Sequence, residues 1–327
     1  MGNEGKYPLT TGKFGCILFY MKVKQSIPQE LRFTIEQFNR MFPDNDSCLD
    51  WLMSQRYPGY MAHCAYCNVE RKFHRVTTRK VYSCDHCGTM IAPMAGTIFE
   101  KSSTPLRLWF YALYLMSATR CGISAKQIQR EVGVTYKTAW RMFKQIRTLM
   151  SEDIRLEGTT VEADEMYFGG KNKNKHLSKR KGFDGRSNDE KTPVFGMVER
   201  GGCVIAVVTP NAQSKTILPI IHERVLPESI VYTDDYPIYD KLAQHPNGYV
   251  HRRIQHAQKV YVMGDIHTNT IEGFWSLVKR GIGGVYHSVS KKYLQTYLNE
   301  YSFRYNRRMQ NQPMFTSLLT QVIGKAE

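Results

Sequence analysis

Four cysteines of this chain are spaced like metal ligands. Two residues separate Cys64 from Cys67, and sixteen residues later Cys84 and Cys87 repeat that spacing. A Cys-x2-Cys turn directs two thiolates at one point, and two such turns complete a tetrahedral shell around zinc with no position left for water. The spacing therefore predicts one structural zinc ion. Four buried, reduced thiols without a metal would not explain two paired turns so close together.

The role of this zinc ribbon stays open between DNA contact and docking to another protein. Basic residues between the two cysteine pairs favour DNA contact. These residues are Arg71, Lys72, Arg75, Arg79 and Lys80. The alternative that the paired cysteines form disulfides is disfavoured, because tight pairs in an intracellular chain of this size are more often metal ligands.

A second group of possible ligands consists of carboxylates at the ends of two predicted strands. Asp164 ends the strand-like run 159–163, and Asp234 ends the run 230–233. A single acid at a strand end is usually a turn or cap residue. The joint pattern favours a metal site, because clustered carboxylates repel one another unless divalent cations neutralise them. Two Mg²⁺ ions about 3.5–4 Å apart suit phosphodiester chemistry.

A third carboxylate lies on a predicted helix that starts at Asn269. Glu272 shares one face of that helix with Asn269 and Lys279, because these spacings follow the helical period. The three acids converge if the first and fourth predicted strands are neighbours in a mixed sheet. Glu165 and Asp235 rank second as ligands, because successive side chains on a strand point to opposite faces.

The charge of the chain indicates a polyanionic partner. Its 327 residues include 45 Lys and Arg against 29 Asp and Glu, which gives a net charge of +16. Nucleic acid is favoured over acidic lipid, because membrane-surface binding would need a concentrated basic amphipathic helix or a lipidation signal, and the start of the chain lacks the Ser or Thr of a myristoylation motif. No apolar run approaches the roughly 20 residues that span a bilayer, which excludes an integral membrane protein. The apolar stretch 14–21 is a poor signal peptide, and either Met1 or Met21 fits as the start. We expect a cytoplasmic, nucleoid-associated protein with no membrane contact and no organic cofactor.

The pattern of apolar residues divides the chain into five regions. They are an N-terminal extension (1–32), a helical lead-in with the zinc ribbon (33–99), a helical DNA-binding region (100–157), a catalytic domain (158–310) and a C-terminal tail (311–327). The catalytic domain alternates strand and helix patterns, which predicts an α/β fold with a mixed sheet flanked by helices. Its strands are expected at 159–163, 194–198, 204–208, 230–233 and 249–254, and its helices at 214–226, 237–244, 269–280 and 290–308.

Residues 122–150 carry a helix-turn-helix pattern. Ser124 can cap a first helix, Gly133 breaks it, and Thr135 can cap a second one. We expect the polar face of the second helix to contact DNA, unless the pair is only a structural hairpin. The residues of that face are Tyr136, Lys137, Arg141, Lys144 and Arg147. Lys171 opens the basic segment 171–191, which is expected to add phosphate contacts or merely to keep the chain solvated.

Several further stretches, taken together, carry a resemblance to a known family. They are residues 96–99, 164–171, 196–200, 267–272, 279–280 and 304–308. The chain resembles the DDE-type transposases of a bacterial insertion-sequence family that joins an N-terminal zinc ribbon to an RNase H-like domain, kin to the Merlin transposons. The resemblance covers residues 35–318.

This resemblance implies an RNase H-like fold and metal-dependent transfer of DNA strands. Asp164 and Asp234 would be the first two catalytic ligands, Glu272 the third with Asn269 as its substitute, and Lys279 would steady a phosphate. The implied cofactors are Mg²⁺ or Mn²⁺, two ions at the catalytic site. The implied partner is double-stranded DNA, both transposon ends and target, bound by a homodimer or a larger assembly.

Two other functions stay open. One is a transposase-derived regulator that binds DNA without cutting it, against which the presence of Asp164, Asp234 and Glu272 argues. The other is a metal-dependent nuclease or resolvase that hydrolyses DNA without joining strands. The zinc ribbon and the helix-turn-helix favour an enzyme that recognises particular DNA ends, and therefore a transposase.

Overall fold

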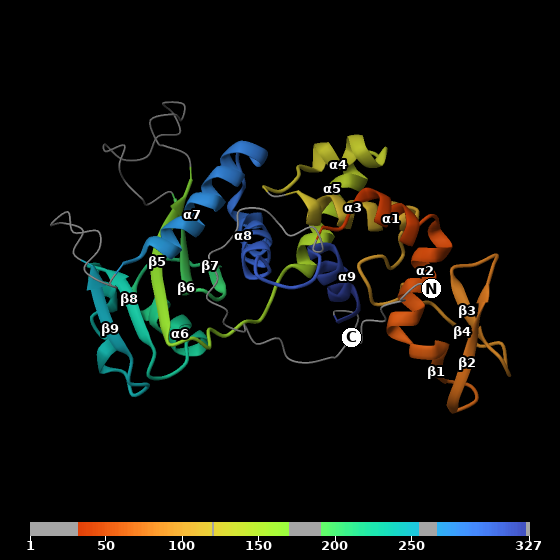
Figure 1. Cartoon of the computed structure of the whole chain (residues 1–327), viewed down its shortest axis with the longest axis horizontal. Helices are drawn as coiled ribbons and strands as arrows, with labels where there is room; N and C mark the ends of the chain where they lie inside the picture. Colours follow the sequence, from red (N-terminus) through yellow and green to blue (C-terminus); the bar gives the residue numbers. More distant parts are fainter. Residues whose placement is uncertain (1–31, 120, 170–190, 255–266, 325–327) are drawn as a thin grey trace, which may run out of the picture. The chain divides into compact units, whose positions relative to one another are not determined.

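The chain folds into two compact units, each with its own hydrophobic core. The computed structural model, drawn in Figure 1, describes residues 32–119, 121–169, 191–254 and 267–324. We call the first unit the sheet unit; it contains the described residues of 154–205 and 209–272. The second, the helical unit, contains the described residues of 32–153, 206–208 and 273–324.

The helical unit begins with two short helices and the zinc ribbon. Both helices start at capping boxes, formed by Thr34 with Gln37 and by Asp44 with Ser47. The ribbon is an antiparallel sheet of order β1-β2-β3-β4. The bounds are α1 (Ile35–Met41), α2 (Asn45–Arg56), β1 (Met61–Cys64), β2 (Val69–Val76), β3 (Val81–Cys84) and β4 (Met90–Ile91). A 3-10 turn, Pro58–Tyr60, connects α2 to the ribbon.

Three further helices follow the ribbon. They are α3 (Leu106–Ala118), α4 (Ala125–Val132) and α5 (Tyr136–Leu149). Trp109 and Phe110 of α3 are fully buried. Helix α4 ends at Gly133, whose φ of 72° is a left-handed conformation that glycine adopts without Cβ strain. Thr135 then caps α5, so the two helices form the helix-turn-helix that the sequence predicts.

Two C-terminal helices complete the helical unit. They are α8 (Lys291–Asn306) and α9 (Met314–Gly324). Tyr297 and Tyr301 of α8 are buried, so their rings pack in the interior. Helix α9 lies in the segment expected as a tail, and its apolar side chains at helical spacing are part of the core. These side chains are Phe315, Leu318, Leu319 and Val322.

The sheet unit is built on a five-stranded mixed sheet of order β7-β6-β5-β8-β9. Its central strand β5 runs antiparallel to β6 and parallel to β8, and β8 runs parallel to β9. The bounds are β5 (Thr160–Phe168), β6 (Thr192–Glu199), β7 (Val204–Val208), β8 (Ile230–Asp234) and β9 (Val250–Ile254). The first strand of the sheet therefore adjoins the fourth, and the predicted RNase H-like α/β fold is confirmed.

Helices complete the sheet unit. From α6 (Ser214–Arg224), Ile217 and Ile221 pack on Val161 and Phe195 of the sheet. The helix expected at 237–244 is instead two 3-10 turns, Pro237–Tyr239 and Leu242–Gln244, a geometry that is frequent in short connecting segments.

The last helix to start in the sheet unit is α7 (Asn269–Gly281), which continues into a π-helical turn, Ile282–Tyr286. Its residues 269–272 belong to the sheet unit, and the rest belong to the helical unit. In the part of the chain that the structure describes, no helix is long and apolar enough to cross a membrane.

Candidate metal centres and DNA-contact surface

The four cysteines of the ribbon lie together as one set of ligands. Their sulfur atoms are all within 4.8 Å of one another. Cys64 ends β1 and Cys84 ends β3, so each pair sits at the end of a strand. Asn68, which follows the first cysteine pair, has a φ of 54°. This is the left-handed conformation that a glycine often adopts directly after a Cys-x2-Cys turn. Four thiolates at these separations fit tetrahedral zinc.

Hydrogen bonds favour the thiolate form of two of the four ribbon cysteines, Cys64 and Cys87, whereas burial raises the pKa of Cys67 to about 12. The hydroxyl and backbone N–H of Thr89 lie 3.1 Å and 3.5 Å from Cys87 Sγ, and they lower the pKa of this thiol to about 6. The backbone N–H of Cys67 donates to Cys64 Sγ and lowers the pKa of Cys64. Because zinc binds thiolates, these contacts prepare the site for the ion.

Three carboxylates form the second candidate centre. Asp164, Glu165 and Asp234 offer oxygen atoms within 4.8 Å of one another. Asp234 ends β8, and its Oδ1 accepts the backbone N–H of Tyr236 at 3.1 Å. Asp164 and Glu165 lie on β5 beyond the last residue of β5 that pairs with β8. This group fits divalent cations, because close carboxylates are held apart by repulsion unless positive charge neutralises them.

The expectation that Glu165 points away from the site is wrong. The pairing of β5 with β8 ends at Glu162, so Glu165 lies on a part of β5 that β8 does not pair with. The carboxylate of Glu165 lies with those of Asp164 and Asp234. Tyr239, which is buried in the core, donates its hydroxyl to Glu165. Burial raises the pKa of Glu165 to about 7; the hydrogen bond from Tyr239 opposes this shift, and the charges of the two aspartates add to it.

Glu272 lies apart from the group of three. Its side chain is exposed in the first turn of α7, where Oε1 accepts the hydroxyl of Thr268 at 3.1 Å. Asn269, Asp235 and Lys279 are exposed as well. Among the described residues, the structure therefore brings two members of the predicted triad together and adds Glu165 in place of Glu272.

Sequence reasoning missed three residues that surround this centre. Glu162 is fully buried on β5 and accepts a hydrogen bond from Arg200 Nε at 2.7 Å. Its position two residues before Asp164 places both on one face of the strand, a signal that was present in the sequence. Arg200 lies in one of the stretches that carry the family resemblance. No sequence signal indicated Tyr239.

Helix α5 presents a basic face to solvent. Ala139 and Met142 are buried on the opposite face. The exposed residues are Tyr136, Lys137, Arg141 and Lys144, four of the five that were predicted to contact DNA. Lys171, a further predicted contact, lies outside the described residues.

The fifth residue, Arg147, is only 1% exposed, so the prediction that it faces DNA is wrong. Its Nε donates to Glu300 Oε2 at 2.7 Å. Its guanidinium also lies 3.6 Å from the ring centre of Phe143 and 3.5 Å from that of Tyr297. Because α8 packs against the last turn of α5, a position that reads as polar in the sequence is enclosed.

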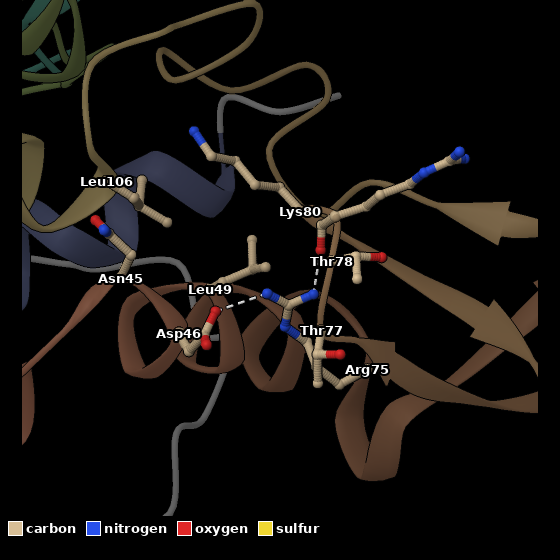
Figure 2. Close-up of a pocket in the computed structure, with 9 residues that line it drawn as sticks. Asn45, Asp46, Leu49, Arg75, Thr77, Thr78, Lys80 and Leu106 are labelled. Atoms are coloured by element: carbon tan, nitrogen blue, oxygen red, sulfur yellow. Dashed lines mark hydrogen bonds and ion pairs between the residues drawn. The ribbon is translucent and has the colours of Figure 1, made fainter.

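A basic cavity of about 260 Å³ lies between α2 and the β2–β3 turn (Figure 2). The Arg75 guanidinium points across it and donates to Asp46 Oδ1 at 2.6 Å (Figure 2). It also donates to the backbone carbonyl of Arg79 in the turn. The positive charge of Arg75 is therefore paired with Asp46 within the fold. Arg79 and Lys80 also line the cavity and are exposed, so they are available to an anion.

Comparisons with known proteins match two regions of the chain to transposase domains. The sequence matches the ISXO2-like transposase domain over residues 155–306 and the transposase zinc-ribbon domain over residues 43–90. An uncharacterised protein in the transposable element ISH50 of Halobacterium salinarum is 31% identical over 255 residues, which are 74% of this chain and 84% of that protein. An uncharacterised transposase-like protein of Haemophilus influenzae is 39% identical over 103 residues, 32% of this chain and 80% of that protein.

One solved structure also aligns with the chain. It is a chain from the intasome of simian T-cell lymphotropic virus in complex with the PP2A regulatory subunit B56 gamma. The TM-score is 0.29 at 13% identity, and the alignment covers 62% of this chain and 67% of that one. The assignment of the fold depends instead on the strand order of the sheet.

Proposed function

The chain belongs to the family of DDE transposases that join a transposase zinc ribbon to an ISXO2-like transposase domain, and from this premise we propose that it binds the ends of its insertion sequence and joins them to target DNA. The proposed chemistry is metal-dependent hydrolysis of a phosphodiester, followed by attack of the freed 3′-OH on the target strand. The observation that supports it is the group of Asp164, Glu165 and Asp234 in a chain of net charge +16.

Asp164 and Asp234 are the proposed ligands of the catalytic cations. Mg²⁺ or Mn²⁺, two ions in this proposal, supplies the charge that activates an attacking oxygen and stabilises a leaving one. The third ligand is Glu272 in our proposal, with Asn269 as its substitute, and Glu165 is a competitor because it already lies in the group. Lys279 would contact a phosphate next to the cut strand.

The chain's own residues prepare this site before any cation binds. The backbone N–H of Tyr236 fixes one oxygen of Asp234, and Tyr239 fixes the carboxylate of Glu165. Fixed carboxylates lose little conformational freedom when they bind a cation, which favours binding. The ribbon would hold one structural zinc ion, which takes no part in the reaction because four cysteines leave it no open position.

DNA recognition is assigned to the helical unit. Helix α5 would enter the major groove with Lys137, Arg141 and Lys144, as the second helix of such motifs does. Arg79 and Lys80 at the ribbon cavity would add phosphate contacts that do not depend on sequence. Because two ends must be joined in one event, we propose at least a dimer in the DNA complex.

The decisive experiment is a strand-transfer assay with Mg²⁺ on DNA that carries the ends flanking this gene. Wild type should give joined products, and Asp164→Asn should keep DNA binding and lose both cleavage and joining. The matched control is Asp235→Asn, which removes an exposed acid next to Asp234 that lies outside the group of three. This control should behave like wild type.

Other outcomes would overturn parts of the proposal. Nicked products without joined ones from the wild type would indicate a metal-dependent nuclease or resolvase. Specific binding without either product would indicate a DNA-binding regulator. Equal loss of activity in both variants would contradict the assignment of Asp164 as a ligand.

A further inference from the structure

The strongest unassigned feature of the sheet unit is the buried carboxylate of Glu162. The residue is fully buried on the central strand of the sheet, in register with Val198 and Tyr232. An ionised group removed from water is costly unless hydrogen-bond donors surround it. Four donors from two residues of α7 and from Arg200 contact this carboxylate, so its burial is compensated.

Three of these donors belong to the start of α7. Oε2 accepts the backbone N–H of Thr270 at 2.8 Å and that of Ile271 at 3.1 Å, and Oε1 accepts the hydroxyl of Thr270 at 2.8 Å. The first N–H groups of a helix have no partner within the helix, and a side chain just before the helix usually satisfies them. Here the cap comes from a strand 108 residues earlier, so it is a tertiary contact.

Arg200 completes this contact from the turn that follows β6. Its Nε donates to Glu162 Oε1 at 2.7 Å, and its Nη2 donates to the backbone carbonyl of His267 at 2.8 Å. The guanidinium also lies 4.4 Å from the ring centre of Tyr232 on β8. Arg200 therefore ties the capping carboxylate to the segment that leads into α7, and it neutralises the buried charge.

The geometry points to Glu162, held by Arg200, as a positioning residue that caps α7 and fixes the first turn of this helix against the strand that carries Asp164. This inference goes beyond the proposed function and rests on it, because the first turn of α7 carries Asn269 and Glu272. Glu162 itself stays out of the group of three carboxylates, since both of its oxygens are committed to α7 and Arg200. It acts through the helix and does not touch the cations.

The test compares full-length Glu162→Ala and Glu162→Gln with wild type by three measurements. Hydrogen exchange reports the Thr270 and Ile271 amides, titration with Mn²⁺ reports cation affinity, and cleavage of pre-bound end DNA reports turnover. We expect faster exchange at the start of α7, a loss of about 10- to 100-fold in Mn²⁺ affinity or turnover, and DNA affinity within about twofold of wild type. Glu162→Gln should be milder, because its amide oxygen still accepts one helix N–H.

Glu199→Gln is the matched control. Glu199 is another buried acid of the same sheet, only 3% exposed, but it packs against Gly158 and Gly202 rather than α7. This variant should lose some stability and keep wild-type exchange at Thr270, cation affinity and turnover. A second check is the double variant Glu162→Gln with Arg200→Gln, whose effects should be less than additive because the two residues act as one pair.

Wild-type exchange and turnover in a folded Glu162→Ala would overturn the inference while leaving the proposed function intact. Equal loss of DNA affinity and turnover would also overturn it, because that pattern indicates a general structural role. If wild type itself neither binds Mn²⁺ nor cleaves DNA, the proposed function fails instead. The exchange measurement then still decides whether Glu162 caps α7.

Discussion

The cysteine centre and the carboxylate centre are both compact sets of metal ligands, but they are assembled in different ways. The four cysteines come from two turns of one ribbon, and the first and last of them are only 23 residues apart. The carboxylates come from β5 and β8, seventy residues apart, and are adjacent only because those strands pair. Local turns thus build the first centre, whereas the sheet builds the second.

This difference predicts opposite roles of the metal in stability. The ribbon is small, and the four thiols of its two turns lie together as one set of ligands, so zinc binding and folding of the ribbon should be coupled. The carboxylates repel one another on a sheet that already has a core of its own, so the sheet unit should fold without a cation.

The largest expected effect is that of Cys84→Ser. Loss of one of four ligands should release zinc and unfold the ribbon, because structural zinc contributes about 10–16 kcal/mol of apparent binding free energy in small ribbons. Bound zinc per chain and thermal unfolding of the full-length protein measure this. Cys121→Ser is the control, since Cys121 is exposed and free. Zinc retained at wild-type stoichiometry in Cys84→Ser would contradict the closed four-cysteine site.

Asp164→Asn should reduce activity strongly and leave stability intact, whereas Cys84→Ser should reduce stability. Cleavage should fall by at least about 10³-fold, because several kcal/mol of charge stabilisation in the transition state are lost. The melting temperature without metal should stay at the wild-type value or rise, since one of three repelling carboxylates is removed. Parallel cleavage assays and calorimetry test both halves. A marked loss of stability would indicate that Asp164 has a structural role and is not mainly a catalytic ligand.

The third ligand is decided by comparing Glu165→Gln with Glu272→Gln. If Glu272 moves into the group when DNA and cations bind, Glu272→Gln should lose about 10²-fold or more in turnover and Glu165→Gln much less. The reverse order would assign the third position to Glu165. Turnover at saturating Mg²⁺ and DNA is the measurement, and Asn269→Ala in the same series tests the substitute ligand.

The two centres should also respond differently to pH. Burial holds the pKa of Glu165 near 7, so its carboxylate is protonated below that pH and cannot bind a cation. The pKa of the Cys87 thiol is about 6, so the ribbon keeps a thiolate there to lower pH. If Glu165 is the third ligand, Mn²⁺ affinity should fall several-fold between pH 8 and 6.5 while zinc stays bound. Mn²⁺ titration and a colorimetric zinc-release assay measure the two.

The pKa of Glu165 also affects stability without metal. The folded-state pKa is raised above the ordinary value of 4.5, so the protonated form is favoured by folding. Stability of the metal-free protein should therefore fall as pH rises from about 4.5 through about 7. Glu165→Gln should abolish this part of the slope in calorimetric scans, and an unchanged slope would contradict the assignment.

The effect expected on DNA binding by α5 is smaller than the effects expected on cleavage. Lys137→Ala together with Arg141→Ala should weaken binding to end DNA by about tenfold or more and reduce the salt dependence of log K by about 1.8, since each phosphate contact contributes about 0.9. Lys101→Ala is the control, because Lys101 is an exposed lysine outside the helix-turn-helix. Fluorescence anisotropy at several salt concentrations measures both quantities. Unchanged affinity would make the helix pair purely structural.

The sequence predicted correctly what a local motif determines, and it was wrong where tertiary contacts decide the position of a side chain. All four cysteines were predicted as one set of ligands, and the structure brings all four together, because a short motif determines its own geometry. Glu165 was set aside because successive side chains on a strand point to opposite faces, yet its carboxylate lies with those of Asp164 and Asp234. Arg147 was taken as exposed because nothing in α5 indicates that α8 covers it.

The sequence by itself determined the grouping of the four cysteines, the helix-turn-helix and most of the order of strands and helices, because each depends on spacings within some tens of residues. Only the tertiary structure decided which acids meet, that Glu162 caps a helix 108 residues away, and that Arg147 is enclosed by Glu300 and two aromatic rings. These depend on which elements pack together. Such contacts arise from burial of whole surfaces, and no single residue or spacing encodes them.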